Sequence, residues 1–170
     1  MKYFIIFIGI LSAFSCENKP KEKPGSEALE NAEIEIYDFD QLESVLGSFS
    51  DKTLVVNFWA TWCKPCIAEL PYFEKIQEEN KERVKVLLVS LDFPNKLEDQ
   101  LVPFIEKKGL RSQVVLLDDP YENEWIPKVD STWSGAIPAT LIIHKSKRAF
   151  YERSFSKDEL EKELLKFIKL

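Results

Sequence analysis

A short apolar run ends just before two closely spaced cysteines, and this junction constrains the fold more than any other feature of the chain. Residues 54–59 are nearly all apolar, and Cys63 and Cys66 follow within seven positions. A run of this kind is typical of a central strand that is covered on both faces of a sheet. Apolar residues at helical spacing then predict a helix over residues 65–81. The cysteines are therefore expected at the start of a helix that follows a buried strand.

Two thiols in the first turn of a helix can form a disulfide with little movement of the backbone. The free N–H groups and the positive end of the helix dipole favour a thiolate on Cys63, and Lys64 adds a nearby cation. Pro65 fits there because the first turn does not need its N–H. We expect Cys63 to be an exposed nucleophile that attacks a partner disulfide, while Cys66, deeper in the helix, resolves the mixed disulfide.

Two other interpretations of the cysteine pair are weaker. A structural zinc site needs four ligands, and only His144 and Cys16 remain as candidates beside the pair. An inert structural disulfide between Cys63 and Cys66 would close too small a loop to stabilise the fold much. We therefore expect a redox-active pair, with neither a metal nor a cofactor.

The N-terminus has the pattern of a processing signal. Lys2 precedes an apolar run over residues 3–14, which is shorter than the about 20 residues of a membrane-spanning helix and suits a signal peptide. Small residues at positions 13 and 15 come directly before Cys16. Residues 1–15 are predicted to be removed, either by ordinary secretory cleavage or by lipoprotein processing. The stretch 13–16 resembles a bacterial lipoprotein signal, which implies a lipidated Cys16 as the mature N-terminus.

Composition divides the remaining chain into a tether and one domain. Residues 16–33 mix Lys and Glu with Pro and Gly and hold almost nothing apolar, which predicts a flexible segment. Residues 34–170 can bury one core, since 45% of the whole chain is apolar and 12% aromatic. The net charge is −6, from 23 basic and 29 acidic residues, and no basic patch is interleaved with aromatics. Nucleic acid is thus not an expected partner.

Strand and helix patterns alternate through the predicted domain, with capping boxes expected at Asp40 with Glu43 and at Ser156 with Glu159. Pro127 argues against a continuous helix in residues 121–132. The order predicts a mixed sheet with helices on both faces, ending in an antiparallel pair and a helix. The expected strands cover residues 34–37, 54–59, 84–91, 114–117, 139–144 and 148–153. The expected helices cover residues 40–46, 65–81, 95–109 and a last one from 156 onward.

Two motifs resemble one known family. Residues 57–66, NFWATWCKPC, with ELP at 69–71, resemble the active-site segment of the TlpA/ResA-type thiol–disulfide oxidoreductases of the thioredoxin superfamily. Residues 137–140, IPAT, match the family's second signature, a cis proline just before a strand. The resemblance implies an α/β thioredoxin-like fold over residues 34–170, a mixed central sheet flanked by helices. It also implies the extra strand and helix of this branch, between about 114 and 132.

The resemblance implies roles for residues around the cysteines. Trp62 supports the pair, Pro138 packs against it, and the backbone of Ile137 pairs with substrate backbone as in strand addition. Thioredoxin proper has a buried aspartate where Asn57 stands, and this branch uses an acidic residue near the end of the following strand. Asp92 lies one position away from that place.

The proton acceptor for Cys66 stays open at this point. Asp92, Glu69 and water are the alternatives, because Asn57 cannot ionise. Asp92 could equally be a turn residue at the end of its strand.

The function implied is an extracytoplasmic protein-disulfide reductase, anchored to a membrane through Cys16 or else soluble in the periplasm. Its partners would be disulfide-bearing exported proteins, cytochrome c precursors among them, and it would act as a monomer. Because that compartment is oxidising, a reductase needs a membrane electron donor of the thioredoxin-coupled type. A disulfide oxidase or isomerase and a non-catalytic binding module with this fold are the alternatives.

Overall fold

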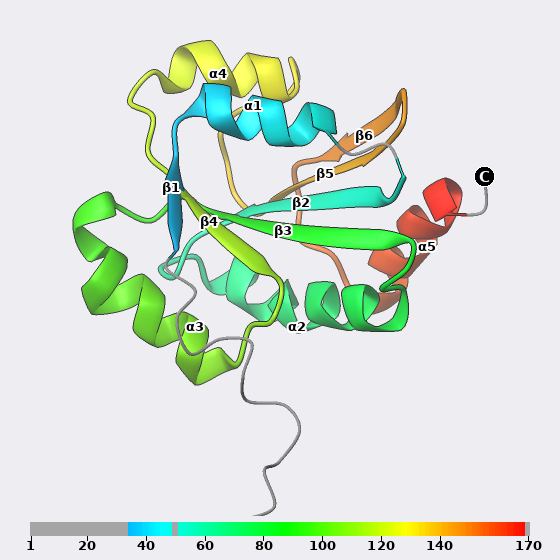
Figure 1. Ribbon diagram of the computed structural model, residues 1–170, viewed down its shortest axis with the longest axis horizontal. Coiled ribbons are helices and arrows are strands. Elements are labelled where there is room, and N and C mark those ends of the chain that lie inside the picture. Colours follow the sequence, from blue (N-terminus) through cyan, green and yellow to red (C-terminus); the bar gives the residue numbers. More distant parts are fainter. Residues whose placement is uncertain (1–33, 49–50, 169–170) are drawn as a thin grey trace, which may run out of the picture. The chain divides into compact units, whose positions relative to one another are not determined.

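The computed structural model describes residues 34–48 and 51–168. They fold around a mixed sheet (Figure 1). Its six strands are β1 (Glu35–Tyr37), β2 (Thr53–Trp59), β3 (Val84–Ser90), β4 (Gln113–Leu117), β5 (Ala139–His144) and β6 (Lys147–Tyr151). They lie in the order β1-β4-β3-β2-β5-β6. Strands β1, β4, β3 and β2 are parallel to one another, whereas β5 is antiparallel to β2 and β6 is antiparallel to β5. The predicted mixed sheet with a final antiparallel pair is confirmed.

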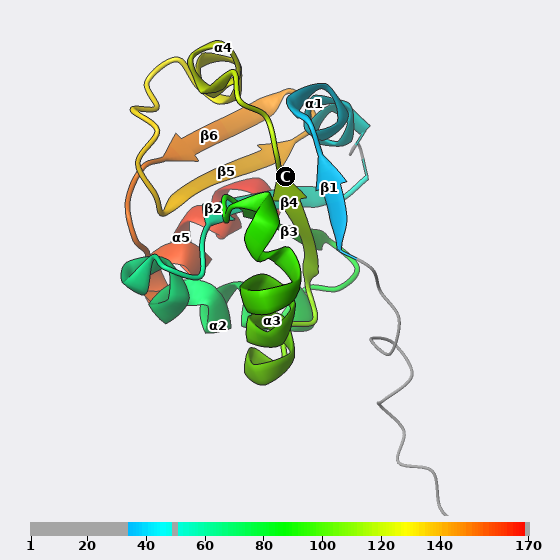
Figure 2. The ribbon, with the colours of Figure 1, turned by 90° about the vertical axis from the view of Figure 1, so that its left-hand side faces the viewer.

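Helices cover both faces of this sheet (Figures 1 and 2). On one face lie α1 (Phe39–Ser48) and α4 (Glu122–Val129), and on the other α2 (Lys64–Glu79), α3 (Val102–Lys108) and α5 (Lys157–Ile168). Each layer of helices closes one hydrophobic core against the sheet. No helix among residues 34–48 and 51–168 has the length and apolar character needed to cross a membrane. The predicted signal peptide (1–15), the tether (16–33) and Cys16 lie outside the described residues.

Strand β2 is buried over its whole length, which explains its nearly uninterrupted apolar sequence. Successive side chains alternate between the two cores. Val55 and Trp59 face the core under α2, while Val56 and Phe58 face the core under α1. Asn57 shares the α2 side by this alternation and is fully buried.

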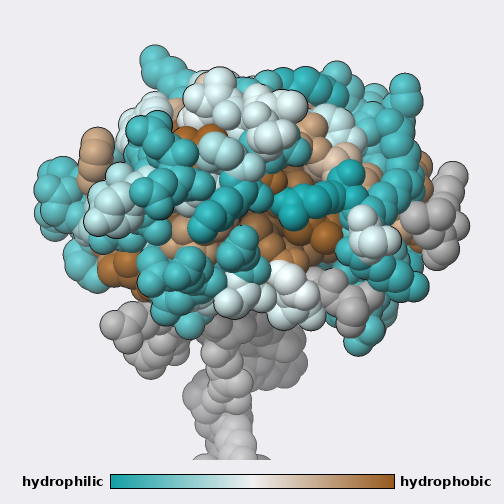
Figure 3. All heavy atoms as spheres, turned by 90° about the horizontal axis from the view of Figure 1, so that it is seen from above, coloured by the Kyte–Doolittle hydropathy of each residue, from teal (hydrophilic) through white to brown (hydrophobic). Residues whose placement is uncertain are grey.

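The extra strand and helix implied by the resemblance are present as β4 and α4. Strand β4 pairs with β1 on one side and β3 on the other, which places it inside the sheet. Seen from above (Figure 3), the α1 and α4 side of the molecule carries mainly hydrophilic residues, with hydrophobic ones visible between them.

Helix α4 corrects the expectation that Pro127 would interrupt any helix here. Pro127 is the sixth of eight residues, so its missing N–H removes one backbone bond, and the Asp130 N–H still bonds the Ile126 carbonyl at 3.2 Å. Trp125 and Val129 are buried in the core beneath the helix. Tertiary packing of this apolar face outweighs the cost of one proline.

The predicted single helix over residues 95–109 is also wrong in detail. A 3₁₀ turn, η1 (Pro94–Lys96), and a π-helical turn, η2 (Leu97–Leu101), precede α3. Pro103, the second residue of α3, cannot donate to the carbonyl four residues before it, and the wider π turn contains that carbonyl. Gly109, with φ of 64°, caps the C-terminus of α3 in the left-handed conformation, at the end of the predicted range.

The predicted cap of α5 is confirmed, whereas the predicted cap of α1 is wrong. Ser156 and Glu159 form the expected capping box, with the Ser156 N–H donating to the Glu159 carboxylate at 2.9 Å. For α1, the box begins at Asp38 and not at Asp40: the Gln41 N–H donates to Asp38 Oδ1 at 2.8 Å, and the Asp38 N–H to Gln41 Oε1 at 3.0 Å. The earlier start lets Phe39 enter the core.

Replacing Asp38 tests which aspartate caps α1. Asp38→Ala should lower the free energy of unfolding by about 1 kcal/mol, because the Gln41 N–H loses its acceptor. Asp40→Ala is the matched control and should change it by less than about 0.5 kcal/mol. Urea denaturation of the two variants measures both values, and a larger loss for Asp40→Ala would contradict the assignment.

Candidate active site

The two predicted cysteines are joined in a disulfide at the start of α2. The S–S distance is 2.01 Å and the Cα atoms lie 5.3 Å apart. Cys63 is the N-cap residue of α2, and its Sγ accepts the Cys66 N–H at 3.3 Å. A thiolate formed at Cys63 would be stabilised by this N–H and by the positive end of the helix dipole. Pro65 is in the first turn of α2, and Lys64 and Pro65 are both exposed.

The segment before β5 closes over this disulfide. The Ile137–Pro138 peptide bond is cis, as the resemblance implied, and Pro138 is buried. The carbonyl oxygen of Ile137 lies 3.9 Å from Cys63 Sγ. The backbone that the resemblance assigns to substrate pairing is therefore next to the sulfur that would attack.

The expectation that Cys63 is exposed is wrong for this disulfide form. Cys63 is 5% exposed and Cys66 0%, because the segment that ends in Pro138 lies against Cys63 Sγ. Cys63 is still the outer of the two sulfurs. The residue that projects into solvent is Trp62, which is 57% exposed.

Asp92 holds the loop that leads to Cys63. Its carboxylate is buried and accepts the Thr61 hydroxyl at 2.6 Å, the Thr61 N–H at 3.0 Å and the Ser90 hydroxyl at 2.8 Å. Gln100 donates to the Thr61 hydroxyl in turn. These donors engage both carboxylate oxygens. Asp92 is thus more than a turn residue, since it fixes the chain two residues before Cys63.

Glu69 is the second candidate proton acceptor, and it lies one helical turn after Cys66 on α2. Its side chain is 1% exposed. Asn57 Nδ2 donates to Oε1 at 3.0 Å, and the Phe155 N–H donates to Oε2 at 2.7 Å. Burial raises the pKa of Glu69 to about 7, although these two hydrogen bonds and the charge of Arg153 act to lower it. This carboxyl therefore titrates near neutral pH.

Sequence reasoning did not find the partners that hold Glu69. Asn57 was noted only as a residue that cannot ionise, yet its Nδ2 bonds both Glu69 and the Thr140 hydroxyl, the latter at 3.2 Å. Phe155 lies 86 positions from Glu69, and no local pattern marks it. Backbone donors of this kind leave no residue-type signal in a sequence.

His144 and Trp133 have structural roles. His144 Nδ1, at the end of β5, lies 3.1 Å from the hydroxyl of Thr53, the first residue of β2. Trp133 is 5% exposed, packs against Phe58 and Trp125, and donates its indole N–H to the Ala136 carbonyl at 2.9 Å. Among residues 34–48 and 51–168, no cluster of three or more His, Cys, Asp or Glu side chains could hold a metal ion.

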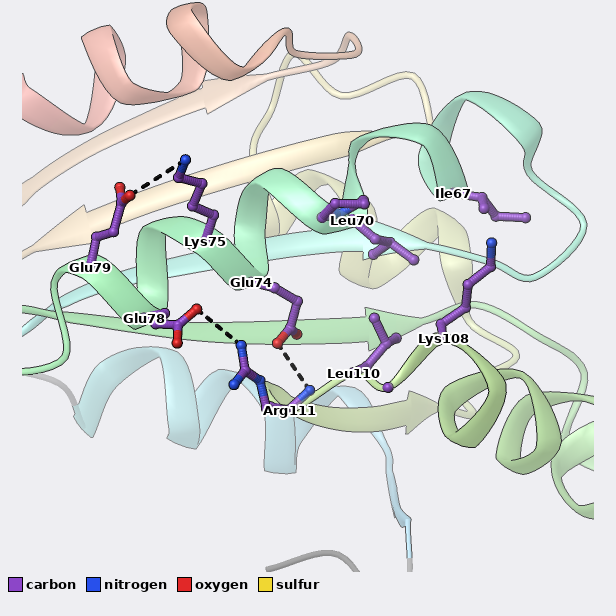
Figure 4. Close-up of a pocket in the computed structure, with 11 residues that line it drawn as sticks. Ile67, Leu70, Glu74, Lys75, Glu78, Glu79, Lys108, Leu110 and Arg111 are labelled. Atoms are coloured by element: carbon purple, nitrogen blue, oxygen red, sulfur yellow. Dashed lines mark hydrogen bonds and ion pairs between the residues drawn. The ribbon is translucent and has the colours of Figure 1, made fainter. Parts of the chain in front are cut away.

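A groove of about 440 Å³ runs between α2 and the turn after α3 (Figure 4). Ile67 and Leu70 contribute apolar surface near the cysteine end of α2. The charged side chains further along are paired with one another: Arg111 with Glu78 at 3.0 Å, and Lys75 with Glu79 at 3.5 Å. The Glu74 carboxylate also accepts the Arg111 and Ser112 N–H groups. This groove therefore offers little unpaired charge to a partner.

The raised pKa of Glu69 predicts a stability that falls with pH. Between about pH 4.5, the ordinary pKa of a glutamate, and pH 7, the folded protein keeps a proton on Glu69 that the unfolded chain has released. The free energy of unfolding should therefore decrease by about 3 kcal/mol across this window. Glu69→Gln should remove this decrease, because its amide does not ionise. Urea denaturation of the oxidised protein at several pH values measures both slopes.

Asp92→Asn provides the contrast for that experiment. An amide NH₂ placed against the Thr61 and Ser90 donors should lower the free energy of unfolding by about 2 kcal/mol throughout the pH range. The decrease between pH 4.5 and 7 should persist. A Glu69→Gln variant that retained the wild-type slope would show that another group titrates in this window.

Comparisons with known proteins place this site in a family. The model of the AhpC/TSA family matches residues 28–148. The thioredoxin-like protein YneN of Bacillus subtilis is 34% identical over 89 residues, which cover 46% of this chain and 52% of YneN. The thiol-disulfide oxidoreductase ResA of Oceanobacillus iheyensis is 42% identical over 64 residues, which cover 37% of this chain and 33% of ResA. The chain thus spans about half the length of the first relative and a third of the second.

The fold has close counterparts among solved structures. A thioredoxin-related protein from Neisseria meningitidis serogroup B superposes with a TM-score of 0.59 at 21% identity, covering 73% of this chain and 87% of that protein. The likeness supports the thioredoxin-like arrangement of the sheet and helices. Since the family model matches most of the chain, including the cysteine pair, this protein belongs to the AhpC/TSA family.

Proposed function

We propose that this protein is an extracytoplasmic thiol–disulfide oxidoreductase that reduces disulfides in exported proteins. One observation carries the proposal. The Cys63–Cys66 disulfide caps α2 next to the cis Ile137–Pro138 bond, with the Ile137 carbonyl 3.9 Å from Cys63 Sγ. A nucleophilic sulfur and a backbone edge for an extended substrate are thus adjacent.

The reaction starts from the dithiol form. The Cys63 thiolate attacks one sulfur of a substrate disulfide, that S–S bond breaks, and the other substrate sulfur leaves as a thiolate. Cys66 then loses its proton and attacks Cys63 Sγ, which releases the second substrate sulfur. Two electrons pass to the substrate, and the protein ends in the disulfide form that the structure contains.

Glu69 accepts the proton of Cys66 in this scheme. It is buried on the same helix, one turn from Cys66, and its pKa of about 7 matches a group that takes up a proton near neutral pH. Asp92 is the weaker candidate, because it lies outside the helix that carries the cysteines and its carboxylate accepts three donors, from Thr61 and Ser90, against two at Glu69. Asp92 acts instead as a positioning residue for the loop before Cys63.

We infer the direction of electron flow from the dipeptide between the cysteines. Lys64 and Pro65 differ from the pairs found in strong oxidants, and we take the couple to be moderately reducing. A membrane electron donor of the thioredoxin-coupled type would return the disulfide to the dithiol. Cytochrome c precursors are one substrate class that the resemblance suggests.

Cysteine variants test the activity. Reduced wild-type protein should reduce insulin disulfides with dithiothreitol as electron source, and Cys63→Ser should abolish the activity. Cys66→Ser should instead accumulate a mixed disulfide between Cys63 and the substrate, because the resolving thiol is missing. Turbidity follows insulin reduction, and non-reducing gels with mass spectrometry detect the adduct.

Two results would contradict this proposal. Equal activity of wild type and Cys63→Ser would leave only a binding module with this fold. Equilibration with glutathione measures the reduction potential of the Cys63–Cys66 pair. A value near that of strong oxidants, roughly −120 mV, would overturn the reductase assignment.

We further propose that Cys16 is lipidated and anchors the domain on the outer side of a bacterial membrane. The support is the sequence of residues 1–16, in which an apolar run and small residues lead to that cysteine. Mass spectrometry of the mature protein from the native host should find an N-terminal Cys16 with acyl modification. Cys16→Ala should release the protein from the membrane fraction, and an unmodified Cys16 would leave a soluble periplasmic protein.

A further inference from the structure

A second groove, of about 640 Å³, opens directly beside the cysteine pair. It lies at the edge of the sheet where the parallel strands end, which faces the viewer in Figure 2. Trp62 and Ile137 line it near the disulfide, and the loop from β4 into α4 lines its far end. The groove therefore continues from the reacting sulfur toward the inserted strand and helix.

Large apolar side chains are left exposed in this groove. Trp62 is 57% exposed and Phe93 69%, and both rings line it. Exposed aromatic rings beside a reactive bond provide contact surface for a partner, since burying them is favourable. The volume lies within the range of about 300–1,000 Å³ typical of ligand sites, so the groove can hold side chains of a bound peptide.

The charged residues that line the groove are all acidic, and none is Lys or Arg. Two of them already serve the fold. Asp92 binds the loop before Cys63, and Asp119 accepts the Phe39 N–H at 3.1 Å and the Tyr121 N–H at 2.9 Å. Asp118 and Glu122 are exposed, and their carboxylates make no hydrogen bond or ion pair with any residue in the described ranges. The groove thus differs from the one along α2, where the charges neutralise one another.

We propose that this groove binds a cationic side chain, arginine above all, that flanks the target cysteine in the substrate polypeptide. The inference rests on the proposed function, since it concerns the substrate of the same cysteines. Arginine suits both features of this groove, because a guanidinium group stacks on aromatic rings and can bond a carboxylate in two places. Asp118 and Glu122 supply the carboxylates. The insertion that carries them is therefore the specificity element of the site.

Matched peptides test this proposal. Two disulfide-containing peptides would differ only in one residue next to the cysteine, arginine in one and its neutral isostere citrulline in the other. The reduced protein should show a kcat/KM about fivefold higher for the arginine peptide at low ionic strength. The preference should shrink at 0.5 M NaCl, because the carboxylates are exposed. The double variant Asp118→Asn, Glu122→Gln should lose the preference, and the control Glu124→Gln, on α4 outside the groove, should keep it.

A binding measurement separates this inference from the catalytic one. Serine analogues of both peptides cannot react, so calorimetry with the oxidised protein reports docking alone. Tighter binding of the arginine analogue, lost in the double variant, supports the groove even if no peptide is reduced. Equal affinities and equal rates for the two peptides, or a preference that survives in the double variant, would overturn the proposal.

Discussion

The path from β2 into α2 is the constraint on which the site depends. Strand β2 is buried on both faces and bonded on both edges, to β3 and β5, so its end is fixed in space. Only residues 60–62 separate it from the N-cap of α2. Asp92, at the end of the neighbouring strand, holds this short loop through two bonds to Thr61. The cysteine pair is thus positioned by a fully buried strand and a hydrogen-bonded loop.

The sequence predicted what burial and spacing determine and missed what tertiary partners determine. The apolar run at 54–59 predicted the strand, and the spacing of the cysteines predicted their place at the start of the helix and their pairing, because both patterns are local. The capping residue of α1 lies two positions before the predicted one because Phe39 stacks on Trp125 with centroids 5.8 Å apart, a contact across 86 positions. Pro127 remained helical for the same reason, since the buried face of α4 outweighs one lost bond. Cys63 proved less exposed than expected because the segment before β5 covers it.

Burying Asn57 and Glu69 costs more free energy than leaving them at the surface would. Asn57 Oδ1 has no hydrogen-bond partner among the described residues, and Glu69 is held by neutral donors from Asn57 and Phe155. Desolvation penalises the carboxylate more than these donors stabilise it, which is why the pKa of Glu69 rises. Because residue 57 is a neutral asparagine, it does not compete with Glu69 for a proton. The fold thereby loses stability as Glu69 ionises and keeps one buried group that titrates near neutral pH.

Chemistry and recognition come from different parts of the chain. The sulfurs, the N-cap and the cis peptide bond belong to α2 and the segment before β5, whereas Asp118 and Glu122 belong to the inserted β4–α4 unit. Strand β4 is hydrogen-bonded on both edges, to β1 and β3. The loop that follows it is held at its first residue, where the Asp118 N–H donates to the Tyr37 carbonyl at 2.8 Å. Substitutions in this loop can change the charge of the groove without moving β2 or α2. A fold arranged in this way can alter its substrate preference while its redox chemistry stays the same.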